Sequence, residues 1–335
     1  MSCYKEETYK MKEIGGYLEL DRYNLPLLHE EAIALNCGRN TLAYLIEARN
    51  IKKLCIPYFL CDSVKNTCIR LGVNIRYYNI SNNFVPDGSL ELQADEWLYV
   101  VNYYGQISYD VQKNLVERYK TVIMDYAQAY FEKPLLGVDT LYTCRKFFGV
   151  VDGAFLYTDS SIGRELNQDE SFERMHFILG RYERNANEFY NEYAMNNRLF
   201  TNEPIKKMSK LTQNLLRGID YVAVGEQRQQ NFSFLNDQFK GLNKLNLRIP
   251  FGAFMYPLLV KDGQKIRKKL LEKKIYIPVL WPEVLDRCDI NSLEYNFANN
   301  ILPLPCDQRY STDDMKYIVK EILKILDEKM KDSDF

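Results

Sequence analysis

Two patterns of hydrophobic residues alternate along the first half of the chain. Short apolar runs predict buried strands at residues 53–57, 73–78, 97–101, 121–124 and 140–144. Between these runs, apolar residues recur at helical spacing, which predicts helices at 63–71, at 111–119 and after the turn at 37–41. Repeated strand–helix–strand units indicate an α/β fold whose mainly parallel sheet has helices on both faces. In such a sheet, ligands gather at the carboxyl ends of the strands.

The pattern changes in the second half of the chain. Residues 165–202 are rich in Glu, Arg, Asn and Tyr, which predicts polar helices that cross the surface or pack between lobes. Beyond residue 228, the sequence predicts strands at 251–260 and 275–279, a Pro-rich strand at 302–305, a basic-faced helix at 264–273 and a terminal amphipathic helix at 313–327. We therefore expect an N-terminal arm (1–14), a large domain (15–227) and a smaller C-terminal α+β domain (228–335).

The composition is that of a globular protein large enough for two lobes, with 335 residues, 46% hydrophobic and 27% charged. The 44 Lys and Arg residues nearly balance the 45 Asp and Glu residues, so no basic excess points to nucleic acid or to an anionic membrane. The chain has no apolar run of about 18 residues and its first residues are polar, so we expect neither a membrane span nor a secretion signal. Eight cysteines without a C-x-x-C pair favour a cytoplasmic protein with reduced thiols.

Histidine is too scarce for several kinds of catalysis. Only His29 and His176 are present, and neither lies in a recognisable motif. A Cys-His or Ser-His-Asp nucleophile would need one of them as its base, and a zinc site usually needs histidines or paired cysteines. We therefore expect neither of these mechanisms and no metal.

Lys146 is the most informative residue. It lies 21 positions after Asp125, which closes an apolar strand, and six positions before an acid-glycine turn at 152–154. Pyridoxal phosphate catalysis needs an amine that forms a Schiff base with the aldehyde and a carboxylate that keeps the pyridine nitrogen protonated. Lys146 and Asp125 are the candidates for these two catalytic roles, and Arg145 would help to lower the pKa of the amine.

The cofactor also needs partners for its phosphate and its ring. Gly38, Arg39, Asn40 and Thr41 open a predicted helix, where backbone N–H groups and side-chain donors would bind phosphate, and Thr143 is a second candidate ligand. Gln128, three positions after Asp125, would reach the ring hydroxyl or pack on the ring face. The joint order and spacing of these segments indicate a pyridoxal phosphate enzyme, although each segment alone is typical of an ordinary cap or turn.

These segments resemble the sugar aminotransferases of the DegT/DnrJ/EryC1/StrS family, which are fold-type I pyridoxal phosphate enzymes. In that family an acid-x-x-His/Gln segment precedes the lysine and a Glu-Gly-Gly turn follows it, and Asp125, Gln128, Lys146 and the 152–154 turn match this order. Residues 55–72 and 302–305 are similar as well, so the resemblance covers most of the chain. It implies a homodimer with active sites at the subunit interface. It also implies transfer of an amino group from an amino acid, with glutamate as the expected donor, to a keto-sugar nucleotide for surface polysaccharide synthesis.

The chain departs from that family in several places. Both the chain and its segment between the acid and the lysine are shorter, and Cys61 occupies the cofactor-site position where a ring-stacking aromatic residue is usual. The candidates for the stacking role are therefore Tyr58, Phe59, Tyr103 and Gln128.

Four further residues are weaker candidates. Tyr103 and Tyr104 follow a predicted strand and would either line the substrate pocket or pack in the core. Arg309 would either hold a carboxylate bidentately or lie in a solvated turn. Asn202 begins a segment that resembles the one which, in this family, crosses to the partner subunit's cofactor, and a surface helix cap is the alternative.

Two other functions stay open at this point. The same cofactor residues would serve sugar dehydration, decarboxylation or transamination of a small amino acid. A non-catalytic relative would use the fold for binding or assembly, and the presence of Lys146 argues against it.

Overall fold

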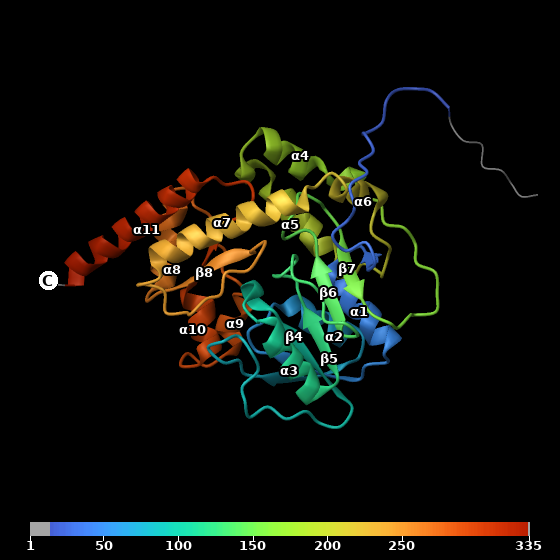
Figure 1. Cartoon of the computed structure of the whole chain (residues 1–335), viewed down its shortest axis with the longest axis horizontal. Coiled ribbons are helices and arrows are strands. Elements are labelled where there is room, and N and C mark those ends of the chain that lie inside the picture. Colours follow the sequence, from blue (N-terminus) through green and yellow to red (C-terminus); the bar gives the residue numbers. More distant parts are fainter. Residues whose placement is uncertain (1–13, 334–335) are drawn as a thin grey trace, which may run out of the picture.

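A seven-stranded sheet organises the first half of the chain (Figure 1). The computed structural model describes residues 14–333, so residues 1–13 of the predicted N-terminal arm lie outside the described part. The strands of this sheet are β1 (Ile33–Leu35), β2 (Lys53–Pro57), β3 (Asn74–Tyr78), β4 (Glu96–Val101), β5 (Val122–Asp125), β6 (Asp139–Thr143) and β7 (Ala154–Tyr157). Their spatial order is β1-β7-β6-β5-β4-β2-β3, and only the two pairings of β7 are antiparallel. The predicted mainly parallel sheet is confirmed.

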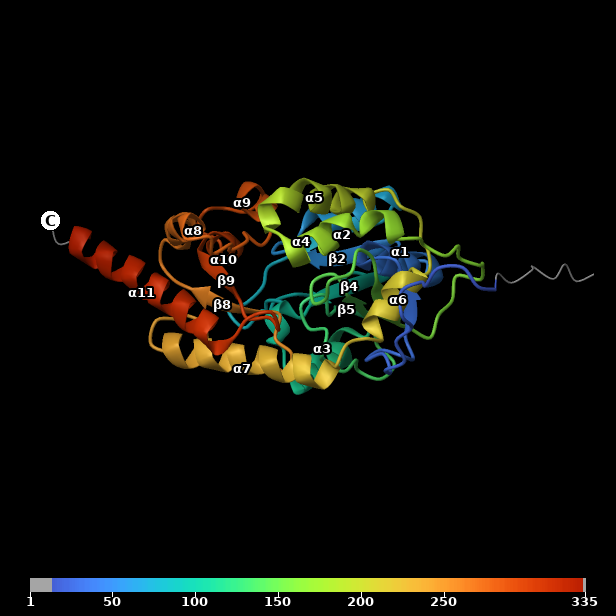
Figure 2. The same ribbon diagram turned by 90° about the horizontal axis from the view of Figure 1, so that it is seen from above.

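Helices cover both faces of this sheet. Helices α1 (Gly38–Ala48) and α2 (Asp62–Arg70) lie together on one face, and α3 (Tyr109–Tyr119) lies on the other (Figure 2). Because both faces are covered, strands β2, β4 and β5 are almost entirely buried, which accounts for their uninterrupted apolar sequences. Helix α3 begins where the Ser108 hydroxyl caps the Val111 backbone N–H.

The polar middle of the chain is only partly helical. The predicted helices of residues 165–202 are confirmed at α4 (His176–Glu183) and α5 (Tyr190–Leu199), together with the short 3₁₀ helices η2 (Phe172–Arg174) and η3 (Ala186–Phe189). Residues 158–170 form loops. Helix α6 (Lys210–Leu216) then leads into the long helix α7 (Tyr221–Phe239), which the sequence pattern did not indicate.

The C-terminal part has its own small sheet and its own core. Strands β8 (Met255–Leu259) and β9 (Ile301–Pro305) pair antiparallel. The remaining helices are α8 (Gly263–Glu272), α9 (Glu283–Arg287), α10 (Leu293–Asn300) and α11 (Thr312–Ser333). A hydrophobic core that runs from Phe232 to Ile325 joins α7, α8 and α11 to the small sheet, and α11 projects from the body of the molecule (Figure 1). Helix α7 crosses the predicted division at residue 228, and that division stays a prediction.

The strand predicted at residues 275–279 is wrong. Ile275 and Ile277 are buried and Tyr276 is exposed, so the segment alternates as a strand would. However, the small sheet consists only of β8 and β9 in the described residues, and Pro278 has no backbone N–H to give to a ladder. The alternating pattern therefore reflects burial on one side of an extended segment, without strand pairing.

Candidate active site

A cavity of about 260 Å³ lies where several strands of the large sheet end. We call it the Lys146 cavity. Its lining residues are Cys37, Gly38, Arg39, Leu42, Cys61, Ser63, Val64, Tyr99, Asp125, Ala127, Leu141, Thr143, Arg145, Lys146, Tyr193, Asn197 and Trp281. Six predicted cofactor residues from four separate segments are among them, namely Gly38, Arg39, Cys61, Asp125, Thr143 and Lys146.

The topology of the sheet explains why these segments meet. Asp125 ends β5 and is paired with Leu141 of β6, so the carboxyl ends of both strands reach the same edge. Strand β7 runs back from this edge, because Ala154 at its start is paired with Thr143. Strand β1 pairs antiparallel with β7 and therefore also ends here, directly before α1. The acid, the lysine turn and the start of α1 are thus brought together by backbone pairing alone.

Asp125 is a buried carboxylate with two donors. The Tyr99 hydroxyl donates to Oδ2 (2.8 Å) and the Ala127 backbone N–H donates to Oδ1 (2.7 Å). Burial raises the pKa of Asp125, while attraction to Lys146 and the two hydrogen bonds oppose that rise. Burial also raises the pKa of Tyr99 far above its ordinary value, so Tyr99 remains a donor. A carboxylate has about four lone-pair sites, so Asp125 keeps capacity for a further donor.

Lys146 lies in a tight turn that connects the end of β6 to β7. The Phe147 and Phe148 backbone N–H groups both donate to the Cys144 carbonyl (2.9 and 3.0 Å), which closes the turn. The Lys146 side chain itself is exposed, and its Nζ lies 5.7 Å from the centre of the Phe254 ring. The amine is therefore accessible to a ligand in the cavity, while its backbone is fixed.

Two helix N-termini and two arginines make the cavity favourable for an anion. Cys37 caps α1 and Cys61 caps α2, and neither side chain satisfies the N–H groups of the first turn. Arg39 donates to the Asn197 carbonyl (2.9 Å) and Arg145 donates to the Asn197 side-chain oxygen. Burial lowers the pKa of Arg145 because it disfavours the charged form. The arginines thus converge on α5 at the wall of the cavity.

The remaining predicted cofactor residues lie outside the lining of this cavity. Asn40 donates to the Pro204 carbonyl (2.7 Å), and the Thr41 hydroxyl donates to the Gly38 carbonyl (2.7 Å). Gln128 is buried, and its Oε1 accepts the Tyr104 backbone N–H (2.9 Å). Its Nε2 has no hydrogen-bond partner among the described residues. This orphaned donor next to the cavity residue Ala127 is what a bound acceptor would satisfy.

The predicted substrate and stacking residues also lie elsewhere. Tyr103 and Tyr104 are fully buried, and the Tyr103 hydroxyl donates to the Phe59 carbonyl. Arg309 is held bidentately by Asp307 of its own chain (2.7 and 2.8 Å). Asn202 is exposed in a turn. Tyr58 stacks on Tyr77 at 4.8 Å, away from the cavity lining. The roles assigned to these residues stay predictions.

Several lining residues were missed by the sequence. Tyr99, Tyr193, Asn197 and Trp281 come from segments that carry no spacing relation to Lys146. One weak feature of the sequence pointed to Tyr99: it lies two residues before the end of β4, the strand that pairs with β5. No sequence signal pointed to Trp281, because it reaches the cavity from a segment 135 positions after Lys146.

A larger groove adjoins the Lys146 cavity. It encloses about 1160 Å³ and shares Arg145 and Tyr193 with the cavity. We call it the arginine–tyrosine groove, because it is lined by the cations Arg145, Arg181, Arg184, Lys274 and Arg309 and by the tyrosines Tyr182, Tyr190, Tyr193, Tyr276 and Tyr310. Its single acidic lining residue, Glu188, is paired with Arg184. The groove therefore favours an anionic ligand with flat groups.

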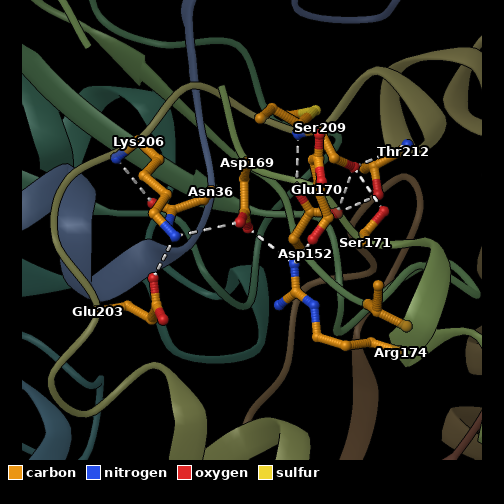
Figure 3. A network of polar contacts seen from close by, with 12 residues as sticks. Asn36, Asp152, Asp169, Glu170, Ser171, Arg174, Glu203, Lys206, Ser209 and Thr212 are labelled. Carbon is orange, nitrogen blue, oxygen red and sulfur yellow. Dashed lines mark hydrogen bonds and ion pairs between the residues drawn. The ribbon is translucent and has the colours of Figure 1, made fainter. Parts of the chain in front are cut away.

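The turn after Lys146 is anchored by the buried Asp152 (Figure 3). The Ser209 backbone N–H and hydroxyl donate to its two oxygens (both 2.8 Å), and the Thr212 hydroxyl donates to Oδ1. Burial raises the pKa of Asp152, and these hydrogen bonds oppose the rise. The neighbouring Asp169 pairs with Arg174 (2.8 Å) and Lys206 (3.6 Å). Asp152 thus fixes the lysine turn to the start of α6.

Residues 14–333 contain neither a metal-binding cluster nor a membrane-spanning helix. These residues hold no group of three His, Cys, Asp or Glu side chains placed to bind a metal ion. They also contain no helix that is both long enough and apolar enough to cross a membrane.

Comparison with known proteins identifies the fold. No family model matches the sequence, and no curated protein matches it. Among solved structures, Spr1654 from Streptococcus pneumoniae, a proposed sugar aminotransferase, matches in its apo form with a TM-score of 0.67 and 14% identity, over 91% of this chain and 88% of that chain. Sugar aminotransferase CalS13 from Micromonospora echinospora matches with a TM-score of 0.60 and 15% identity, over 88% and 87% of the two chains.

A third match is a DegT DnrJ EryC1 StrS aminotransferase from Brucella abortus, with a TM-score of 0.58 and 14% identity, over 88% of this chain and 85% of that chain. Spr1654 has also been solved in PLP and PMP forms. At these identities the likeness shows the fold. The chain therefore has the mixed α/β fold of the DegT/DnrJ/EryC1/StrS sugar aminotransferases, as the sequence resemblance predicted.

Proposed function

We propose that this protein is a pyridoxal phosphate-dependent aminotransferase that moves an amino group from an amino acid, with glutamate as donor, to a keto-sugar carried on a nucleotide. The observation that carries the proposal is the Lys146 cavity. It combines an accessible lysine, a buried acid that accepts two hydrogen bonds, and the N-terminus of α1 in one cavity. The solved structures with this fold that are named as sugar aminotransferases support the substrate class.

The residues present fit the cofactor. The first turn of α1, Arg39 and Thr143 would hold the phosphate, because an anion at a helix N-terminus is stabilised by free N–H groups and by the helix dipole. The unfilled lone pairs of Asp125 would accept a proton-bearing ring nitrogen, and the orphaned Gln128 amide would find a partner at the ring. A cavity of about 260 Å³ is slightly smaller than typical drug-sized pockets, as expected for a compact cofactor.

The roles of the residues follow from these positions. Pyridoxal phosphate, when bound, supplies an aldehyde that takes up the amino group and a ring that accepts electrons. Lys146 would hold the cofactor covalently and, once the donor amine has displaced it, move a proton from the donor α-carbon. Asp125 would keep the ring nitrogen protonated throughout, with Tyr99 fixing the orientation of its carboxylate.

The acceptor would occupy the arginine–tyrosine groove. Arg184 and Arg309 are paired with Glu188 and Asp307, so the cations that suit a diphosphate are Arg145, Arg181 and Lys274. The tyrosines suit a base and a sugar ring. The groove and the Lys146 cavity share Arg145 and Tyr193 as lining residues, and in the proposed arrangement a keto-sugar at one end of the ligand would pass these two side chains to reach Lys146. The proposed pathway is surface polysaccharide synthesis, and the proposed assembly is a homodimer in which Asn202 reaches the partner's cofactor site.

The first test is attachment of the cofactor. Purified protein mixed with pyridoxal phosphate should develop a visible absorption band that borohydride abolishes, and peptide mapping should place the reduced adduct on Lys146. Lys146→Ala should lose the band, whereas Lys133→Ala, at an exposed loop position, should keep it. An adduct on another lysine would contradict the assignment.

The second test is the substrate class. The loaded enzyme should convert keto-sugar nucleotides to amino sugars with glutamate as donor, and α-ketoglutarate should appear in equal amount. Turnover of a small amino acid with every keto-sugar nucleotide inert would refute the substrate class while leaving the cofactor chemistry intact.

A further inference from the structure

One aromatic side chain of the Lys146 cavity comes from a part of the chain far from all the others. Every other lining residue lies between positions 37 and 197, whereas Trp281 directly precedes α9 and packs into the same hydrophobic core as the large sheet. It is only 9% exposed, so most of its indole surface is already packed against protein. The segment before α9 therefore contributes a wall to this cavity through a single ring.

Trp281 is held in place before any ligand binds. Its ring packs edge-on against Phe59 at 4.8 Å and against Tyr103 at 5.7 Å. Its φ angle is +67°, a left-handed conformation that is strained for a bulky residue. The strain persists because Pro282 and helix α9 follow immediately, and the Val284 N–H donates to the Trp281 carbonyl (3.0 Å).

Helix α9 is itself fixed to the large lobe. Arg287 pairs with Asp62 (2.9 Å) and donates to the carbonyls of Tyr58 (3.1 Å) and Leu60 (2.6 Å). These groups lie between the end of β2 and the start of α2, which is the edge that forms the cavity. Trp281 is therefore anchored on both sides to the rim of the cavity.

The other aromatic residues of the cavity are less suited to contact a flat ligand. The Tyr99 hydroxyl is engaged by Asp125. Tyr193 is 48% exposed on α5 and also faces the arginine–tyrosine groove. Trp281 is the largest of these rings and has a fixed position, and no hydrogen bond to Asp125 engages it.

We propose that Trp281 is the aromatic contact of the cofactor ring, and that through this contact the segment before α9 covers the cofactor. The inference rests on the proposed function, because it takes pyridoxal phosphate as the ligand of the Lys146 cavity. It assigns to this segment a role in cofactor retention. Loss of one aromatic contact weakens ring binding roughly 10-fold.

The test is a binding measurement with pyridoxine 5'-phosphate, which lacks the aldehyde and therefore does not bond to Lys146. Calorimetry on the full chain should show roughly 10-fold weaker binding for Trp281→Leu and Trp281→Ala. Trp281→Phe should bind within about threefold of the wild type, because it retains a ring. Trp97→Phe is the matched control, since Trp97 is the other tryptophan and lies at the far end of β4. It should bind as the wild type does.

Comparison of the Leu and Phe variants separates contact from folding. Trp281→Leu also loses the ring contacts with Phe59 and Tyr103 and should melt at a lower temperature than Trp281→Phe, so the affinities are compared well below both melting temperatures, where both variants are folded and a difference between them reports the ring. Equal affinity of the wild type and Trp281→Leu would overturn the inference while leaving the proposed function standing. If the wild type binds neither pyridoxine phosphate nor pyridoxal phosphate, the proposed function fails and the inference fails with it.

Discussion

Removal of the Asp152 carboxylate should destabilise the protein, and the number of buried donors that lose their acceptor sets the size of the loss. In Asp152→Ala, the Ser209 backbone N–H and the Thr212 hydroxyl lose their acceptor in a buried place. The Ser209 hydroxyl keeps a partner, because it also lies 2.8 Å from the Ser171 hydroxyl. Two orphaned donors cost about 1–3 kcal/mol each, and the relief of a buried charge offsets part of this, so we expect a loss of about 3 kcal/mol.

Asp152→Asn should cost less. The amide keeps one acceptor oxygen for the Ser209 N–H, and its NH₂ group would face hydroxyls that can rotate to accept. The loss is then the difference between charged and neutral hydrogen bonds, about 1 kcal/mol. Asp237→Ala, at an exposed position on α7, is the control and should be nearly neutral.

The assay is urea denaturation followed by circular dichroism, together with hydrogen exchange at the Ser209 amide. Asp152→Ala should lower the unfolding midpoint most and should speed exchange at Ser209, because that amide then has no acceptor. Because burial raises the pKa of Asp152 in the folded protein, the wild type should lose stability relative to Asp152→Asn as pH rises from about 4. This reasoning would be refuted if Asp152→Ala were as stable as the wild type, or if Asp152→Asn were less stable than Asp152→Ala.

Three further changes test other parts of the structure. Arg228→Met removes a buried guanidinium that donates to the carbonyl of Phe147 (3.0 Å). The free energy of unfolding, measured by urea denaturation, should fall by about 3 kcal/mol, and a fall of less than about 1 kcal/mol would contradict this. Burial lowers the pKa of His29 to about 4. The free energy of unfolding of the wild type should therefore fall by about 3 kcal/mol more than that of His29→Gln between pH 7 and pH 4. Parallel pH profiles of the two proteins would exclude this. Gly153→Ala places a Cβ 3.0 Å from Thr212 at a residue whose φ is +110°. The substitution should lower the stability of the protein by about 1–3 kcal/mol and weaken cofactor binding. An unchanged melting temperature would count against backbone strain at this position.

The centre of the fold was predictable because its signals are local. Apolar runs in β2, β4 and β5 report strands that are buried on both faces, and such runs stand out in a sequence. The segment at 275–279 shows where this logic stops. Buried and exposed residues do alternate in this segment, but a strand also needs a neighbouring strand to pair with, and β8 pairs with β9 instead. Helix α7 was missed because its buried face includes Gly225, Arg228 and Asn231, which weaken the apolar pattern that marks an amphipathic helix.

The predictable part of the site consists of residues whose types the cofactor chemistry requires and whose order along the chain is characteristic. Asp125, Lys146 and the α1 turn satisfy separate needs of one cofactor, and the sheet brings all three to one edge. Trp281 and Asn197 enter the same cavity through the packing of distant helices and lobes. Neither residue type is demanded by the chemistry at a fixed separation, so no pattern in the sequence points to them.

The contacts that hold the two lobes together also constrain how a substrate enters. Arg228 of α7 donates to the Phe147 carbonyl beside Lys146 and to the Ala253 carbonyl (2.8 Å), and Arg287 bridges α9 to the rim of the cavity. Separation of the lobes would break several hydrogen bonds of charged donors at once, each of which contributes about 1.5–3 kcal/mol. The arginine–tyrosine groove adjoins the cavity, since Arg145 and Tyr193 line both. We therefore expect the acceptor to enter along the groove, past these two side chains, while Trp281 and α9 stay in place.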